Sequence, residues 1–387
     1  MNRKVTLLFV DAGGGHRAAA ASLRDVIGRQ QRPWDVDMVS MQDLFNPIDF
    51  IQRCTGIRYE EIYNIMLRRG WTLGSAHMIR LMHLLIRMTH RRQVEVLHKY
   101  WTHSQPDLVV SLIPHFNRAI AESLGAARPA IPMVTILTDI ADHPPHFWIE
   151  PGQHVICGSE HAARQAAKLG AARIFHTSGM ILNPAFHEAS GGDRGAGRLA
   201  LGLHPGLPTG LVLFGGEGSN DMVKIAHALN RSNRRLQLIL LCGKNAGLAG
   251  ELHALKKQIP MSIHGFTRDV PRFMELSDFF IGKPGPGSIS EALAKQLPVI
   301  VQRNAWTLAH ERYNAQWVEE KGLGLVVRDF ATEIGGAVAT LLAPANFESF
   351  RRRVASIHNR AVFEIPGILE ELLNYAPCAP ETISVSC

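Results

Sequence analysis

The segment Val5-Thr6-Leu7-Leu8-Phe9-Val10-Asp11-Ala12-Gly13-Gly14-Gly15-His16 decides how the fold is interpreted. A largely apolar run of strand length leads directly into three glycines, and the alanine-rich stretch 17–27 predicts a helix. An apolar run without alternation is typical of a strand that is buried on both faces, as in a parallel sheet. The segment therefore predicts a strand, a glycine turn and a helix.

The same pattern recurs later in the chain. The run 211–214 leads into Gly215-Gly216-Glu217-Gly218-Ser219-Asn220 and a predicted helix over 221–229. Further strands are predicted over 108–113, 133–137, 154–157, 236–242, 262–264, 279–281 and 298–301, with helices between them. This alternation predicts an α/β fold with two doubly wound parallel sheets.

The composition changes between 186 and 210, where Gly and Pro replace apolar periodicity. We therefore expect an N-terminal domain over 1–190 with a helical insertion over 45–101, and a second domain over 205–345. A terminal helix within 346–375 is expected to pack back onto the first domain.

Composition excludes several classes of protein. The chain has 387 residues, of which 46% are hydrophobic and 19% charged, which argues against disorder and coiled coil. Its apolar runs fall short of the roughly 20 residues of a transmembrane helix, and the first of them lacks a signal-peptide cleavage pattern. The five cysteines are scattered, without a disulfide or zinc spacing. We therefore expect a cytoplasmic protein.

The net charge of +7 favours an acidic ligand, a nucleic acid or an anionic membrane surface. Most of this charge lies in the insertion 45–101, which holds eight Arg and one Lys against four acids. Within it, an apolar face over 78–88 is interrupted by arginines, a pattern that predicts a basic helix at a membrane interface. The alternative is a covering helix with a solvated polar face.

Glycine-rich turns before helices predict anion sites, because backbone N–H groups and the helix N-terminus both face the ligand. Three are present, at 13–16, 215–219 and 283–288. The first fits a dinucleotide fingerprint loosely, with Asp37 as the ribose acid. Asp37 is predicted near the start of its strand, however, whereas such sites use the far end.

His16 stands where the first strand opens onto the crevice that α/β sheets use for ligands, so we expect it to be a general base. Capping of the helix is the alternative. The polar and aromatic stretch 139–148 follows another strand end and predicts an acceptor wall. His143 and His146 could form a metal pair only on a helix, which the two intervening prolines prevent.

In the second half, the turn Lys283-Pro284-Gly285-Pro286-Gly287-Ser288 suits a diphosphate. Glu291, expected in the first turn of the next helix, is placed to accept hydrogen bonds from ribose hydroxyls; the alternative is a partner of the helix dipole. The cluster 310–314 is suited to bind sugar hydroxyls.

Together these motifs resemble the family of monogalactosyldiacylglycerol synthases and bacterial diacylglycerol glucosyltransferases, MurG-like enzymes of glycosyltransferase family 28 with the GT-B fold. The resemblance rests on Gly13-Gly14-Gly15-His16, on Thr138-Asp139 with His143 and Trp148, and on 282–292. It implies an inverting hexosyltransferase that moves a sugar from a UDP-sugar to diacylglycerol, without metal or redox cofactor, at the cytoplasmic face of an anionic membrane.

The resemblance also implies roles for individual residues. His16 and Asp139 would be catalytic, and the acceptor would contact Gly14, Gly15, His143 and Trp148. The donor would contact Gly215, Gly216, Gly218, Ser219, Phe266, Lys283, Gly285, Gly287, Ser288, Glu291, His310, Glu311 and Asn314. His310 replaces a glutamine that contacts the sugar in relatives, so the transferred hexose stays open.

Other readings stay open. A related transferase could use another lipid-linked or small-molecule alcohol as acceptor, and a UDP-sugar epimerase would share the two-domain architecture. A non-enzymatic protein that binds membranes or nucleic acid through its charge would ignore UDP and bind less tightly in salt. A nicotinamide enzyme rests on the turn at 13–16 alone.

Overall fold

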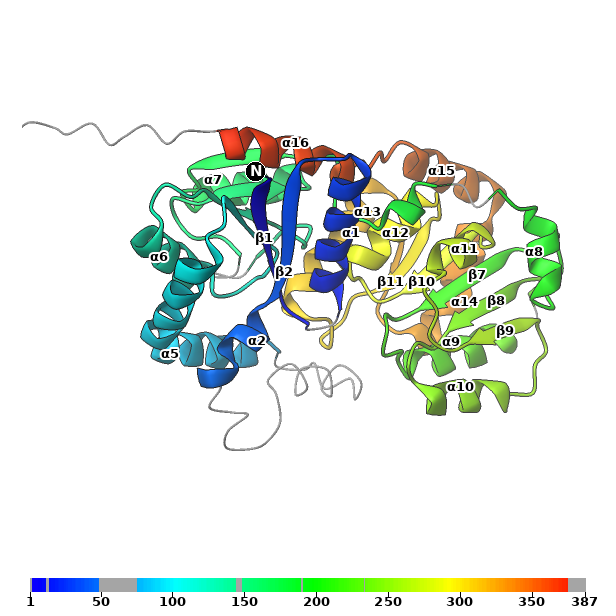
Figure 1. The fold of residues 1–387 in the computed structure, drawn as a ribbon. Helices are drawn as coiled ribbons and strands as arrows, with labels where there is room; N and C mark the ends of the chain where they lie inside the picture. The colour runs from blue at the N-terminus through cyan, green and yellow to red at the C-terminus, as the bar shows by residue number, and fades with distance from the viewer. Residues whose placement is uncertain are drawn as a thin grey trace, which may run out of the picture.

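A computed structural model describes residues 2–11, 14–48, 75–143, 148–188, 191–232 and 234–374. They form two six-stranded parallel sheets, one in each half of the chain, with helices on both faces (Figure 1). The predicted α/β architecture with two doubly wound sheets is thus confirmed.

The first sheet has the strand order β2-β1-β3-β4-β5-β6. Its strands are β1 Arg3–Phe9, β2 Trp34–Ser40, β3 Leu108–Ser111, β4 Met133–Ile136, β5 His154–Cys157 and β6 Arg173–His176. The helices of this half are α1 Gly15–Arg29, α2 Met41–Phe45, α5 Ser75–Ser104, α6 Asn117–Ala127 and α7 Glu160–Lys168. Because chain order reverses between β1 and β3, the ligand crevice is expected beyond the carboxyl ends of these two strands.

The second sheet has the order β12-β11-β10-β7-β8-β9. Its strands are β7 Thr209–Leu213, β8 Gln237–Leu241, β9 Met261–His264, β10 Phe279–Gly282, β11 Val299–Gln302 and β12 Gly324–Val327. The helices are α8 Arg194–Ala200, α9 Asp221–Asn230, α10 Ala246–His253, α11 Val270–Glu275, α12 Pro286–Ala294, α13 Arg312–Lys321, α14 Phe330–Leu342 and α15 Pro344–Ala355. Here the chain order reverses between β7 and β10, so the glycine turns at 215–219 and 283–288 both lie at the switch point.

Burial explains why the strands read as continuous apolar runs. Every residue of β3, β7, β8 and β10 is buried, since helices cover both faces of each sheet. The edge strands β6 and β12 were not predicted from the sequence. They are short and only partly buried, so they lack the apolar run that identified the others.

Two helices begin earlier than the sequence predicts. α1 begins at Gly15 rather than at residue 17, so His16 lies in its first turn instead of in the preceding loop. α12 begins at Pro286 rather than at 289, because proline is well suited to the first helical position. As a result Glu291 lies in the second turn of α12, not in the first.

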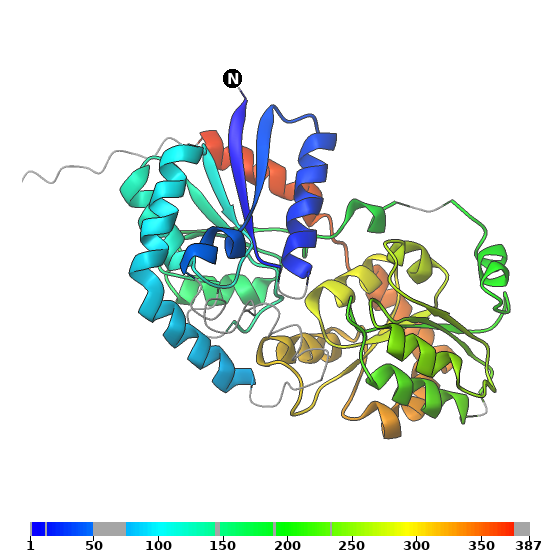
Figure 2. The same ribbon diagram turned by 60° about the horizontal axis from the view of Figure 1, so that its bottom comes forward.

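The segment after 345 forms two helices, α15 and α16 Ala361–Asn374. Figure 2 shows α16 returning along the first half of the molecule, next to α1. Ile365, Leu369 and Leu372 are buried in the same core cluster as β1. The last described helix, α16, therefore completes the core of the first half.

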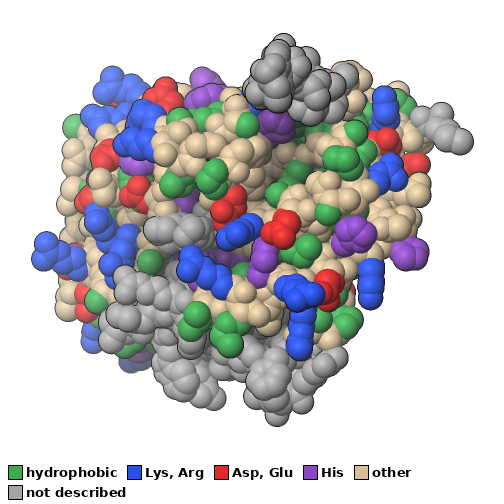
Figure 3. All heavy atoms as spheres, turned by 90° about the vertical axis from the view of Figure 1, so that its left-hand side faces the viewer, with side chains coloured by type: hydrophobic (Ala, Val, Ile, Leu, Met, Phe, Trp, Pro, Cys, Tyr) green, Lys and Arg blue, Asp and Glu red, His purple; other side chains and the backbone are tan. Residues whose placement is uncertain are grey.

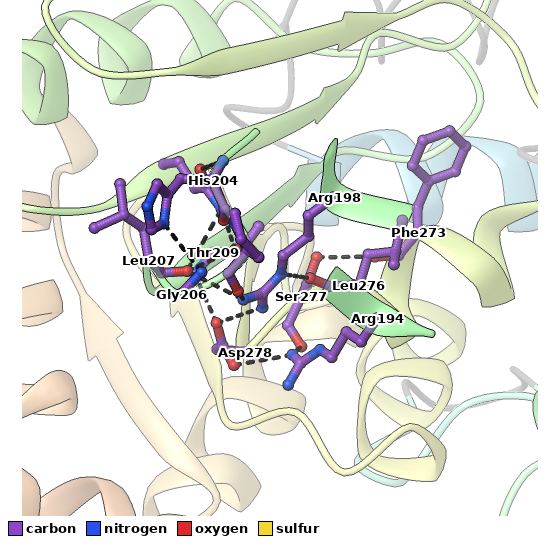
Figure 4. A network of polar contacts seen from close by, with 12 residues as sticks. Arg194, Arg198, His204, Gly206, Leu207, Thr209, Phe273, Leu276, Ser277 and Asp278 are labelled. Carbon is purple, nitrogen blue, oxygen red and sulfur yellow. Dashed lines mark hydrogen bonds and ion pairs between the residues drawn. The ribbon is translucent and has the colours of Figure 1, made fainter. Parts of the chain in front are cut away.

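A buried ion pair fixes the segment that leads into the second sheet (Figure 4). Arg198 of α8 pairs with Asp278 at 2.7 Å, and its guanidinium also donates to the carbonyls of Leu276 and Pro205. Asp278 accepts from the backbone N–H of Thr209 at 2.7 Å. Since the Arg198 side chain is only 6% exposed, its donors are satisfied within the protein and α8 belongs to the second half.

Candidate active site

His16 lies at the start of α1, beyond the carboxyl end of β1. The preceding Gly14 has φ +78°, a left-handed conformation that favours glycine, and no side chain caps the helix. Nδ1 of His16 lies 3.0 Å from Oγ1 of Thr138, which follows β4. Among the described residues, Nε2 of His16 has no hydrogen-bond partner. If Nδ1–H donates to Thr138, Nε2 keeps its lone pair and can accept a proton.

The cleft keeps His16 neutral. Burial lowers the pKa of His16 to about 4, Asp139 opposes this shift, and His310 from the second half adds to it. The influence of His310 shows that the two halves meet at His16. An imidazole that is neutral at pH 7 is in the state that a general base requires.

Asp139 contacts Trp148 instead of His16. Its Oδ2 accepts from Nε1 of Trp148 at 2.7 Å, and both side chains are buried. The ring centroids of His16 and Trp148 are 5.6 Å apart. Trp148 is 1% exposed, so it lies within the cleft wall, where an acceptor could touch little of it. The sequence predicted an acceptor contact for Trp148; its ring contacts both predicted catalytic residues and also His143, with ring centroids 6.4 Å apart.

His143 lies in the same wall and is 4% exposed. The side chain of Gln165 holds its backbone, accepting from its N–H at 3.1 Å and donating to its carbonyl at 2.7 Å. Neither ring nitrogen has a hydrogen-bond partner among the described residues. Burial lowers the pKa of His143 to about 4, so the ring is neutral and can both donate and accept. His146, the other half of the rejected metal pair, lies outside the described residues.

The sequence analysis missed two further histidines near His16. Burial lowers the pKa of His115 well below its ordinary value, and His83 and His16 lower it further. The rings of His115 and His83 are 5.3 Å apart, and His83 belongs to α5. His115 follows β3, so applying the strand-end argument to β3 as well as to β1 and β4 would have identified it.

Two glycine turns face the crevice from the second half. Gly218 has φ +66°, and a Cβ there would lie 2.7 Å from the carbonyl oxygen of Cys242, so a larger residue does not fit. Gly215 and Gly216 have open space around them, and the hydroxyl of Ser219 accepts from the N–H of Asp221. The turn is thus open for a ligand at its backbone.

The second turn leads into α12. Gly285 is the N-cap of α12 and offers no side-chain cap, and the first turn contains no acidic residue. The N–H groups of Gly287 and Ser288 at this end are therefore available to an anion. Asn314, predicted to contact the donor, is fully buried and donates to the carbonyl of Pro284 at 2.8 Å. Its role in the structure is to hold this turn against α13.

Glu291 lies one turn further along α12. Burial raises the pKa of its carboxyl group to about 7, and no hydrogen bond or ion pair to a described residue compensates. A carboxylate in this state gains from any ligand that donates hydrogen bonds to it. A vicinal diol is such a ligand.

Lys283 and Glu311, both predicted to contact the donor, contact each other. Nζ of Lys283 lies 2.8 Å from Oε1 of Glu311, whose side chain is 7% exposed. The pair crosses the turn beside Gly285, where a Cβ would lie 3.3 Å from Cε of Lys283. Phe266 is 58% exposed, with Nζ of Lys244 5.8 Å from its ring centroid. Its face is available for stacking.

Other surfaces of the described residues add no second site of this kind. A cavity of about 740 Å³ lies at the amino ends of β4 and β5 and is bordered by α6. His16 lies at the opposite, carboxyl ends of the strands. No group of three His, Cys, Asp or Glu suited to a metal ion occurs in the described part of the chain. None of the described helices is long and apolar enough to cross a membrane.

Comparison with known proteins shows the class of enzyme. Residues 211–358 match the glycosyltransferase family 28 C-terminal domain. Monogalactosyldiacylglycerol synthase of Spinacia oleracea is 28% identical over 96% of this chain and 73% of its own length. The protein is a glycosyltransferase whose second half matches the family 28 C-terminal domain. Monogalactosyldiacylglycerol synthase 1 of Arabidopsis thaliana is 27% identical over 98% of the chain and 73% of its own length.

Solved structures share the fold of this glycosyltransferase. MurG of Acinetobacter baumannii superposes with a TM-score of 0.58 at 13% identity, covering 95% of this chain and 99% of its own. S. aureus MnaA in complex with UDP gives a TM-score of 0.61 at 13% identity, covering 96% and 97%. The glycosyltransferase SnogD from Streptomyces nogalater gives 0.54 at 14% identity, covering 96% and 100%. The two-domain GT-B architecture predicted from the sequence is confirmed.

Proposed function

We propose that this glycosyltransferase moves a hexose from a UDP-sugar to the hydroxyl of 1,2-diacylglycerol, with inversion, at the cytoplasmic face of a membrane. The observation that carries the proposal is His16, a neutral, half-buried imidazole whose Nε2 has no hydrogen-bond partner among the described residues, at the point where the two halves meet. The names of the similar plant synthases indicate the acceptor class.

In the proposed step, Nε2 of His16 takes the proton of the acceptor hydroxyl. The acceptor oxygen forms a bond to the anomeric carbon, and the bond between that carbon and the diphosphate oxygen breaks. The electron pair of the broken bond leaves with UDP. Attack from the side opposite the leaving group inverts the anomeric carbon.

The second half offers groups that suit the donor. The turns at 215–219 and 285–288 would hold the diphosphate through backbone N–H groups, and the Lys283 ammonium lies beside the second turn. Glu291 would accept from the ribose hydroxyls, and Phe266 would stack on uracil. His310 and Glu311 would contact the sugar. Because N–H groups and a lysine neutralise the diphosphate, the proposal needs no metal, and chelation with EDTA should leave turnover unchanged.

The first half offers a surface that suits an anionic membrane. On α5, Leu84, Leu85 and Met88 are 54%, 41% and 75% exposed. Exposed arginines lie among them, at 87, 91 and 92. Lysine and arginine side chains lie interspersed with hydrophobic ones on the face that carries α5 and α6 (Figure 3). Apolar groups beside arginines are the pattern of a helix that lies in the headgroup region.

Mass spectrometry of the products tests the reaction. Purified protein is incubated with each of several UDP-sugars and with vesicles of diacylglycerol and anionic lipid. A hexosyl-diacylglycerol is expected from one donor. Conversion of the UDP-sugar without any acceptor would instead support an epimerase, and a product with another alcohol would replace the acceptor.

His16→Ala tests the mechanism. General-base catalysis is worth about 10²–10⁴-fold, so turnover should fall by that factor while UDP binding stays unchanged. His98→Ala is the matched control, since His98 is an exposed histidine of α5. Full turnover of His16→Ala would remove His16 from the reaction.

A further inference from the structure

Trp148 is held in place by hydrogen bonds from its backbone and its ring, in addition to its packing. Its backbone has φ +67°, a left-handed conformation that is strained for a bulky residue and persists only where the surroundings hold it. Its N–H donates to the carbonyl of Pro114 at 2.8 Å, and its carbonyl accepts from Nδ2 of Asn117 at 3.0 Å. The indole N–H donates to Asp139 at 2.7 Å. Two hydrogen bonds thus fix the backbone of Trp148, and a third fixes its indole ring.

The indole ring of Trp148 contacts both Asp139 and His16. The direct partner of His16 is the neutral hydroxyl of Thr138, not a carboxylate. Asp139 still acts on His16 through space, since it raises the pKa of the imidazole against the effect of burial. Two other titratable groups are coupled to His16. His310 lowers the pKa of His16, and His16 in turn lowers the pKa of His115.

We propose that Trp148 is a positioning residue of the transfer step: its indole N–H holds the Asp139 carboxylate at a fixed place, and both stabilise the imidazolium that forms on His16. This inference rests on the proposed function, in which His16 accepts the acceptor proton. It assigns Trp148 a role in the transition state instead of a role in acceptor binding.

The physical basis is the appearance of a positive charge on a buried ring. When the acceptor O–H bond breaks and the proton moves to Nε2, His16 becomes a cation at a position where burial disfavours the charged form. The tilted rings of His16 and Trp148 have centroids 5.6 Å apart, so the positive charge forms beside a polarisable ring. Asp139 supplies the opposite charge, and the indole N–H prevents this carboxylate from turning away toward water.

Four variants test the proposal. Asp139→Asn keeps an acceptor for the indole N–H but removes the charge, Trp148→Phe keeps a ring but removes the N–H, and Trp148→Leu removes both. Trp101→Phe is the matched control, because Trp101 is another fully buried tryptophan whose Nε1 donates to the neutral Ser123 at 2.9 Å, in the core of the same half.

Asp139→Asn and Trp148→Leu should lower kcat about ten- to a hundredfold, as expected for a hydrogen bond to a charged group. The KM values for donor and acceptor should change little, and UDP affinity should match that of Trp101→Phe. In the double variant of Asp139→Asn with Trp148→Phe, the second change should add almost nothing, because the N–H acts by holding the charge.

A rise in acceptor KM with unchanged kcat in Trp148→Leu would overturn the proposal and make Trp148 an acceptor contact. Independent, multiplying effects of the two single changes would overturn it as well. Should Trp148→Leu fail to fold, Trp148→Phe and Asp139→Asn give the same comparison.

A second readout does not need turnover. NMR titration of ¹³C-labelled histidine should show that the pKa of His16 falls in Asp139→Asn and in Trp148→Leu but not in Trp101→Phe; an unchanged pKa overturns the proposal. If wild-type protein makes no glycolipid, or His16→Ala remains active, the proposed function fails, whereas the titration still decides the electrostatic role of Trp148.

Discussion

Glu291→Gln should make the ligand-free protein more stable at alkaline pH while weakening its affinity for the donor. In the folded protein the pKa of Glu291 is raised from 4.5 to about 7 by burial alone. Above pH 7 folding therefore requires an ionised, half-buried carboxylate that has no partner among the described residues. A glutamine of the same shape carries no charge and avoids this cost.

The size and sign of the effect follow from linkage. Between pH 4.5 and 7 the folded chain binds a proton at Glu291 that the unfolded chain has released, so stability falls as the pH rises through this window. At about 1.4 kcal/mol per pH unit the upper bound is roughly 3 kcal/mol. Since part of the side chain reaches solvent, we expect about 2 kcal/mol, or about 4–8 °C in the unfolding midpoint of this half.

Thermal unfolding at about pH 5 and about pH 8, with and without UDP, measures the effect. The gain of Glu291→Gln should be large at the higher pH and small at the lower one, and UDP affinity should fall about tenfold, because one charge-assisted acceptor of the ribose is lost. Glu251→Gln, a change at an exposed glutamate of α10, is the control. Equal gains at both pH values, or a loss at the higher one, would refute the reasoning.

Three further changes follow from contacts in the structure. Lys283→Met should weaken UDP binding by roughly tenfold in calorimetry, because it removes the ammonium beside the diphosphate turn, and should lower the unfolding midpoint, because Glu311 loses its partner; unchanged UDP affinity would exclude Lys283 from the donor site. Gln165→Leu should raise the acceptor KM about five- to tenfold with unchanged UDP affinity, because two hydrogen bonds that hold His143 are lost; an unchanged KM would show that His143 does not bind the acceptor. Arg198→Met should destabilise the second half by about 1.5–3 kcal/mol in denaturant titrations, since Asp278 keeps only Arg194 as an ionic partner and the carbonyls of Leu276 and Pro205 lose their donor, and a loss below 1 kcal/mol would contradict this account.

The sequence predicted the two sheets because their central strands are buried on both faces. Residues 211–214 and 279–281 could form little else than parallel strands between glycine turns. The edge strands β6 and β12 escaped detection because a strand that is buried on one side needs no apolar run. Helix starts were placed two to three residues late, at 17 and 289 instead of 15 and 286, since Gly15 and Pro286 read as loop residues.

Strand-end reasoning located the crevice, but not the contacts inside it. His16, Glu291 and the two glycine turns lie where the switch points of the sheets place them. The pairing of Lys283 with Glu311 and the burial of Asn314 depend on how α13 packs against the turn, which no spacing reveals. The sequence therefore identifies which groups reach the crevice, whereas packing decides which of them remain available to a ligand.

The groups that remain available have opposite pH dependences in the two halves. His16 and His143 titrate at about 4 instead of 6.5, so between these values the unfolded chain binds protons that the folded chain does not. The first half should therefore lose stability as the pH falls through this window, while Glu291 makes the second half lose stability as the pH rises.

Because the two windows overlap between pH 4.5 and 6.5, the opposing slopes offset one another in the whole protein. Glu291→Gln should remove one slope and reveal the other, so that the variant becomes steadily less stable on acidification through this range. If UDP donates its ribose hydroxyls to Glu291 as proposed, it should act on wild-type protein in the same direction as the substitution. The first half thus contributes neutral imidazoles, and the second half contributes a carboxylate without a partner among the described residues. Near neutral pH this carboxylate begins to ionise, so a ligand that donates hydrogen bonds to it should stabilise the protein most there. The histidines can act as bases at the same pH.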